Sequence, residues 1–274
     1  MKRIITFIVL ALAVTACSSS DRRFQKTPVD ELIKTMDKKD NFTIVLYDMD
    51  LEEHTFSSDI YRHKYKVVTL EENAADSTVT PKSIETEWYE VPEWYFDDHV
   101  NDMGMEIAAK QDGKVTKQVA PAGYSQYVGN SKYGRWETNS SGESFWSFYG
   151  KYAMMRSLFG MTFYQPVYRS YYTDYSRYRT AGRPYYGTTT VGVTKTSRYG
   201  TFSAASKSSS MANRSFTSKL SSNSSFRNKV NRSVSRSPSS VAAGTRSKTS
   251  RSSSRYGSSS SSSSRSRSSG RGGK

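Results

Sequence analysis

Between residues 27 and 113, apolar positions recur with periods that alternate between those of helices and strands. Thr27 followed by Pro28 is typical of a helix start, because a threonine side chain caps free N–H groups and proline suits the first helical position. Pro92 ends the last strand pattern, and helical spacing follows it up to Gly113. The predicted elements are a helix from residue 28, strands at 42–47, 61–70 and 84–91, and a helix over 94–110.

This order of elements, α-β-β-β-α, predicts an α+β fold for residues 27–113. Three consecutive strands favour a small antiparallel sheet, and we expect the two helices to pack against one of its faces. About ninety residues are enough to bury a modest core. We therefore expect residues 27–113 to form an acidic module, preceded by a polar tether over residues 17–26.

Residues 114–200 form a second segment, which is rich in tyrosine, glycine and arginine. Fourteen of the twenty tyrosines lie between residues 122 and 200. Aromatic and apolar residues from Phe145 to Phe159 recur at helical spacing, which predicts a helix over about 144–159. This helix would pack on the 27–113 module or lie at a membrane interface, and packing is the commoner use of such a stripe. It is too short to span a bilayer.

The last 74 residues, 201–274, are dominated by serine and by basic residues. Serine accounts for 31 of them, and no acidic residue follows Asp174. With so few apolar side chains, burial does not offset the entropy that the chain loses on ordering. We therefore predict a disordered basic tail over residues 201–274.

Charge divides the chain in a similar way. Residues 18–113 hold 11 Lys and Arg against 22 Asp and Glu, whereas residues 114–274 hold 27 against 3. A flexible cationic segment binds polyanions by releasing their counterions, and rings beside guanidinium groups can stack on bases. The alternative is a solvated spacer without a dedicated partner. The residues that we expect to contact a polyanion are Arg169, Arg177, Arg179, Arg183, Arg265, Arg267 and Arg271.

Two acidic clusters that contain a histidine, at 48–54 and 97–102, are candidates for catalysis or metal binding. Carboxylate and imidazole groups bind divalent metals, and the residues that could do so are Asp48, Asp50, His54 and His99. Neither cluster has the spacing of a known metal motif. Charge runs without a motif are usually solvated, so we interpret the first as a surface loop and the second as a solvated helix face. We expect no enzymatic activity, no cofactor and no metal.

The first seventeen residues have the anatomy of an export signal. Lys2 and Arg3 precede an apolar run over residues 4–13, which has the length of a signal peptide and is short for a membrane-spanning helix. The run leads to Val14-Thr15-Ala16-Cys17, and Cys17 is the single cysteine of the chain. These four residues resemble the lipobox of bacterial lipoproteins, although Val14 and Thr15 replace the commoner Leu and Ala or Ser.

The resemblance implies cleavage after residue 16, diacylglycerol on the Cys17 sulfur and acylation of the new amino terminus. Several acyl chains anchor a protein stably, since each buried methylene contributes roughly 0.8 kcal/mol. The alternative is an ordinary secretory signal, but an unpaired cysteine in a secreted protein then needs another explanation. Ser18, in the position after the cysteine, favours the outer over the inner membrane.

Together these features predict a non-catalytic lipoprotein of the cell envelope. We expect its partners to be the membrane, through lipid on Cys17, and anionic envelope polymers or envelope proteins. The alternative function is nucleic-acid binding through the Tyr/Arg segment and the tail. A third hypothesis is an envelope hydrolase or metal-binding protein that uses the two acidic clusters.

Overall fold

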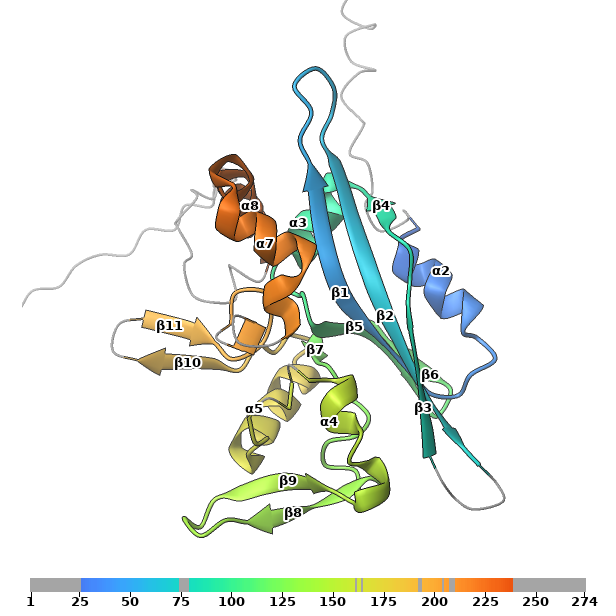
Figure 1. Cartoon of the computed structure of the whole chain (residues 1–274). Helices are drawn as coiled ribbons and strands as arrows, with labels where there is room; N and C mark the ends of the chain where they lie inside the picture. The colour runs from blue at the N-terminus through green and yellow to red at the C-terminus, as the bar shows by residue number, and fades with distance from the viewer. Residues whose placement is uncertain are drawn as a thin grey trace, which may run out of the picture.

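The computed structural model describes residues 26–73, 79–160, 162–163, 165–191, 194–203, 205–206 and 210–238 (Figure 1). An antiparallel sheet with helices packed on it confirms the predicted α+β class. In spatial order the sheet contains β3 (Val79–Glu85), β2 (Ile60–Glu72), β1 (Phe42–Glu52), β5 (Met105–Gln111) and β6 (Lys114–Thr116). Two short strands pair at its margins, β4 (Tyr89–Val91) with β2 and β7 (Ala120–Pro121) with β5.

The helix predicted from residue 28 is α2 (Pro28–Thr35), and its start is confirmed in detail. The Thr27 hydroxyl accepts a hydrogen bond from the Asp30 N–H, and the Asp30 carboxylate accepts one from the Thr27 N–H at 2.9 Å. This reciprocal pair satisfies two N–H groups that the first helical turn leaves open. Val29 and Leu32 then join the buried cluster that contains Phe96 of α3 (Glu93–His99), so both helices contribute to one core.

β1 and β2 form a long antiparallel hairpin (Figure 1). The strands predicted at 42–47 and 61–70 are confirmed, and both are longer than predicted. A bulge between Leu46 and Asp48 shifts the register, and β1 continues to Glu52. The interpretation of residues 48–54 as a solvated loop is therefore wrong for the strand residues, since the Asp48 side chain is buried.

The helix predicted over 94–110 is wrong beyond residue 99. α3 ends at His99, and β5 follows as a neighbour of β1. Gly104, at φ +79°, makes a left-handed turn that a continuing helix does not contain. All residues from Met105 to Lys110 are buried, so β5 lacks the alternation that would distinguish it from a helix. The strand predicted over 84–91 is likewise divided into β3 and β4.

The helix predicted over 144–159 is also wrong. The segment folds as β9 (Ser144–Phe148), the short 3-10 helix η3 (Gly150–Tyr152) and α4 (Met155–Leu158). β9 pairs with β8 (Gly134–Thr138), which places Trp146 opposite Trp136, and this pairing with a neighbouring strand replaces helical hydrogen bonds. The aromatic segment packs on the sheet, which is the alternative that the sequence favoured over a position at the membrane interface. The buried cluster there consists of Val45, Val68, Ala122, Tyr127, Tyr152, Met155 and Phe159.

The prediction of disorder over 201–274 is wrong for the described residues between 210 and 238. They form the 3-10 helix η4 (Ser210–Asn213), α7 (Ser215–Ser222) and α8 (Ser224–Arg236), beyond the two-stranded sheet of β10 (Thr188–Val191) and β11 (Thr194–Ser197). Phe216, Phe226 and Val230 are fully buried. Met211 is buried as well, and Leu220 and Val234 pack against the same cluster. These few apolar residues are enough because the helices place them on faces that meet an existing core. Residues 239–274 lie outside the described residues.

A single hydrophobic cluster contains side chains from α2 through α8, from Val29 to Val230. Tyr175 of α5 (Arg169–Thr180) and the nearby Tyr185 and Tyr199 belong to it. Side chains of the ranges 27–113 and 114–200 therefore lie in one hydrophobic core.

Candidate functional site

The acidic N-terminal part and the basic C-terminal helices are joined by ion pairs. α7 and α8 lie beside one half of β1 (Figure 1). Lys219 of α7 pairs with Asp50 at 2.5 Å, and Lys229 of α8 pairs with Asp59 at 2.6 Å. Arg236 contacts Asp97 at 2.8 Å and Glu93 at 2.9 Å. Part of the charge asymmetry of the chain is thus used inside the fold, because these three basic residues have acidic partners in the same chain.

Asp48 has a structural role at the start of α7. Its carboxylate accepts hydrogen bonds from the N–H groups of Ser215 at 3.0 Å and Phe216 at 3.3 Å. A carboxylate at a helix N-terminus satisfies open N–H groups and interacts favourably with the helix dipole. Arg214 lies beside it, with its guanidinium 3.7 Å from the centre of the Tyr47 ring. Burial raises the pKa of Asp48, against the lowering effect of these N–H groups and of Arg214.

His99, Asp102 and Tyr186 form a hydrogen-bonded set. His99 Nδ1 lies 2.7 Å from Asp102 Oδ2, and the Tyr186 hydroxyl donates to Asp102 Oδ1 at 2.5 Å. Thr201 fixes the backbone around Asp102. Its hydroxyl donates a hydrogen bond to the Val100 carbonyl at 2.7 Å and accepts one from the Met103 N–H at 3.0 Å. Asp102 is buried, which corrects the interpretation of residues 97–102 as a solvated helix face.

This set borders a cavity of about 410 Å³. The other side chains around the cavity include Asp98, Thr116, Lys117, Gln118 and Pro184. A carboxylate on Nδ1 orients a histidine ring and favours the tautomer with its lone pair on Nε2, the arrangement that general bases and metal ligands use. The histidine and aspartate are three residues apart, a spacing visible in the sequence. Tyr186 comes from a distant segment, and no sequence signal pointed to it.

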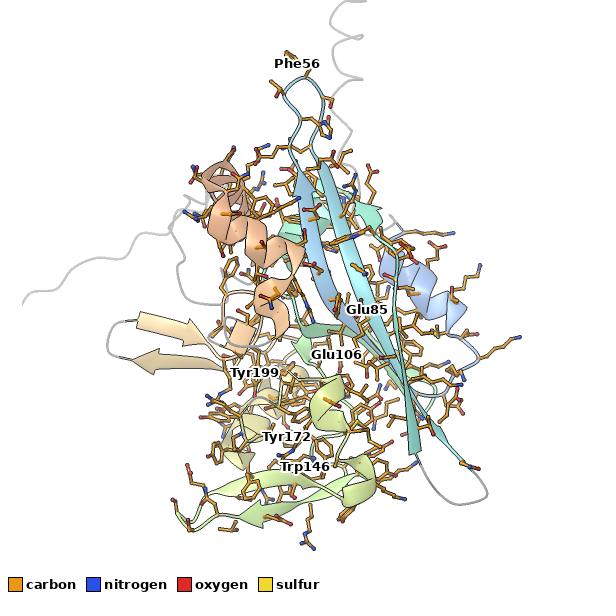
Figure 2. All side chains as sticks on the ribbon, viewed as in Figure 1. Phe56, Glu85, Glu106, Trp146, Tyr172 and Tyr199 are labelled. Atoms are coloured by element: carbon orange, nitrogen blue, oxygen red, sulfur yellow. The ribbon has the colours of Figure 1, made fainter. Side chains whose placement is uncertain are left out.

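Glu106 of β5 is a buried carboxyl group, and in the view of Figure 2 it lies above Tyr172 and Trp146 of the aromatic segment. Its Oε2 accepts a hydrogen bond from the Gly123 N–H at 3.2 Å, and Oε1 has no hydrogen-bond partner among the described residues. Burial raises the pKa of Glu106 to about 7, although the Ser125 hydroxyl, the Gly123 N–H and Arg179 oppose this effect. Because the group is sealed from solvent, we expect it to act on stability rather than on a substrate.

The four predicted polyanion contacts within the described ranges lie on or after α5. Arg169 lies over the Trp136 ring and Arg183 over the Tyr178 ring. Arg177 pairs with Asp174, and Arg179 donates to the Ser125 carbonyl. Each of the four guanidinium groups thus has a different partner within the fold. Tyr175 and Tyr185 are buried, so these two rings are not available to stack on bases. Arg265, Arg267 and Arg271 lie outside the described residues.

Comparison with known proteins bears on the amino terminus. Residues 1–18 match the family model of the prokaryotic membrane lipoprotein lipid attachment site. The protein is a membrane-anchored lipoprotein. The match confirms the signal predicted from Val14-Thr15-Ala16-Cys17, while Cys17 itself lies outside the described residues. Comparisons with curated proteins and with solved structures found no match.

Two further observations concern the rest of the lipoprotein. No helix within the described ranges is both long and apolar enough to cross a membrane. In the same part of the chain, no group of three or more His, Cys, Asp or Glu side chains is arranged to hold a metal ion. The third hypothesis uses Asp48, Asp50, His54 or His99. Asp48 and Asp50 instead contact α7, and His54 lies near Glu52.

Proposed function

We propose that this lipoprotein has a binding rather than a catalytic role, and that residues 239–274 contact anionic polymers of the cell envelope. The observation that carries the proposal is the distribution of charge around the folded part. Residues 26–238 hold 28 Lys and Arg against 24 Asp and Glu, so their charges nearly balance. Residues 239–274 hold eight Lys and Arg and no acidic residue.

The ion pairs of α7 and α8 offset part of the positive charge of the folded region. Lys219, Lys229 and Arg236 have acidic partners on β1, on the loop after it and on α3. Eight cations without acidic neighbours in the sequence attract a polyanion mainly by releasing its counterions, with little preference for its sequence. In a chain held at a membrane by lipid, phosphate-bearing envelope polymers are the polyanions within reach.

The test measures binding of lipopolysaccharide by the mature chain with Cys17→Ser over a range of NaCl concentrations. One variant replaces the eight Lys and Arg of residues 239–274 by Gln, and a matched control replaces Arg169, Arg177, Arg179 and Arg183. We expect the tail variant to lose most of the affinity and its salt dependence, and the control to keep both. The logarithm of the binding constant should fall linearly with the logarithm of the NaCl concentration. The slope should be about −0.7 to −0.9 for each contacted phosphate if the polymer behaves like a nucleic acid.

The opposite pattern, in which the control variant loses binding and the tail variant keeps it, would assign the contacts to the Tyr/Arg segment and overturn the proposal. A parallel titration with duplex DNA addresses the alternative function. Affinity for DNA well above that for lipopolysaccharide at equal salt would favour nucleic-acid binding. Similar affinities would support contact with polyanions in general.

The His99–Asp102–Tyr186 set favours a second candidate function, general-base hydrolysis in the cavity that it borders. The 2.7 Å contact between His99 and Asp102 is the specific observation behind it. The test measures hydrolysis of p-nitrophenyl acetate and bis-p-nitrophenyl phosphate by wild type, His99→Gln and the control His54→Gln. Activity that only His99→Gln abolishes would support this function. Equal rates in all three proteins would reject it.

A further inference from the structure

The outer end of the β1–β2 hairpin carries an aromatic side chain that contacts no other part of the fold. Phe56 has a relative exposure of 101%, the highest among the large hydrophobic residues that the structure describes (Figure 2). Its neighbours in the turn, Thr55, Ser57 and Ser58, are exposed and uncharged. Exposure of a phenyl ring to water is unfavourable. An exposed ring at the end of an extended hairpin is therefore a candidate for contact with an apolar phase.

The acidic residues beside this turn have partners within the fold. Asp59 pairs with Lys229 at 2.6 Å, and the carboxylate of Glu53 accepts a hydrogen bond from the Ser225 hydroxyl at 2.9 Å. Glu52 pairs with Arg62 at 2.7 Å. Cations of α8 and β2 therefore compensate the charges of Asp59 and Glu52, while Glu53 has a neutral hydrogen-bond donor. A membrane surface, which bears anionic head groups, would meet an uncharged turn whose flanking charges are partly compensated.

The start of α2, which follows the lipidated segment in the sequence, lies at the same end of the sheet as the hairpin tip. The Thr27 side chain, at the start of α2, hydrogen-bonds that of Tyr95, whose ring centre lies 5.5 Å from that of His63 on β2. Just beyond the other end of α2, Lys39 pairs with Glu71, near the opposite end of β2. α2 thus begins toward the hairpin tip and runs away from it, as Figure 1 shows.

Chain lengths allow the lipid and the tip to reach one membrane. Phe56 lies seven residues from His63 along the hairpin, or about 23 Å at about 3.3 Å per residue. Ten residues separate Cys17 from Thr27, and an extended chain of that length spans at most about 35 Å. The tether is therefore long enough to place the lipidated residue level with the tip, and short enough to keep this end of the sheet near the bilayer.

We propose that the β1–β2 turn, through Phe56, is a second membrane contact that inserts at the lipid–water interface beside the lipid anchor. An aromatic ring suits this depth. One ring adds little affinity compared with several acyl chains, so its effect is orientation. The anchor alone leaves the domain free to rotate on its tether, whereas a second contact fixes the orientation of the hairpin with its tip toward the membrane. The β8–β9 turn would then face away from the membrane.

The experiment uses the native, lipidated full chain in vesicles of phosphatidylethanolamine and phosphatidylglycerol. Lipid occupies the sulfur of the single native cysteine, so Phe56→Cys introduces one reactive thiol for an environment-sensitive NBD label. Ser141→Cys is the matched control, because this exposed residue lies in the β8–β9 turn at the other end of the molecule (Figure 1).

We expect the label at position 56 to emit at shorter wavelength in vesicles and to be quenched by nitroxide lipids with a shallow spin label. The label at position 141 should show neither effect. An NBD spectrum and quenching at position 56 that match those at position 141 would overturn the proposal. Unchanged far-ultraviolet circular dichroism of both labelled proteins checks that they are folded. Because both proteins are already held on the vesicles by lipid, this result does not depend on polyanion binding by residues 239–274.

Discussion

Glu106 should make the stability of the fold depend on pH in the opposite sense to most carboxyl groups. Burial raises its pKa from 4.5 to about 7. Between these values the folded state keeps a proton that the unfolded chain has released. The stabilisation is complete below pH 4.5 and is lost as pH rises through 7. At about 1.4 kcal/mol per pH unit, this loss amounts to about 3 kcal/mol.

The perturbation is Glu106→Gln, which keeps the shape of the side chain and cannot ionise. The measurement is the free energy of unfolding in urea between pH 4.5 and 8, for the mature chain with Cys17→Ser. We expect the wild type to lose about 3 kcal/mol relative to the variant over this range. The comparison with the variant is essential because other groups, including buried His63, also change stability over these pH values.

An exposed glutamate provides the control. Glu87→Gln removes an exposed carboxyl group, and its pH profile is the baseline against which the Glu106→Gln profile is compared. A wild-type difference from Glu106→Gln that is constant with pH would refute the reasoning, because it would mean that Glu106 ionises in the folded protein as it does in the unfolded chain. A difference that grows toward low pH would refute it as well, since that is the behaviour of a carboxylate stabilised by the fold.

Three further predictions test the packing. Burial holds the pKa of His63 well below 6.5, so the unfolded chain takes up a proton that the fold excludes, and wild-type stability relative to His63→Gln should fall as pH drops through 6.5 in urea titrations. Phe226→Ala in α8 should reduce the free energy of unfolding by about 3 to 5 kcal/mol, whereas no change would mean that α8 does not pack. Gly200 and Gly142 both have positive φ, but a Cβ at Gly200 would lie 2.4 Å from the Asn101 carbonyl oxygen and one at Gly142 meets open space. Thermal unfolding should therefore show a larger loss for Gly200→Ala than for Gly142→Ala, and equal losses would exclude this clash.

Local patterns in the sequence were sufficient where neighbouring residues decide the structure. The start of α2 follows from Thr27, Pro28 and Asp30, which satisfy the first helical turn among themselves. The β1–β2 strands follow from dense β-branched and aromatic runs. The lipid attachment signal is also local, because its charge, apolar length and cysteine lie within eighteen residues. The pairing of His99 with Asp102 belongs here in principle, since three residues separate them.

Tertiary structure decided the elements whose stability depends on distant partners. β5 and β9 have sequences compatible with a helix, and each becomes a strand because a neighbouring strand supplies its hydrogen bonds. α7 and α8 have few apolar residues, yet they form because β1 and α3 present both a core for Phe216 and acidic partners for their basic side chains. Tyr186 reaches Asp102 from 84 residues away. The periodicity of a sequence indicates which positions of an element are buried, but it does not identify the distant segment that covers them. For these elements the stabilising free energy comes from contacts with that distant segment.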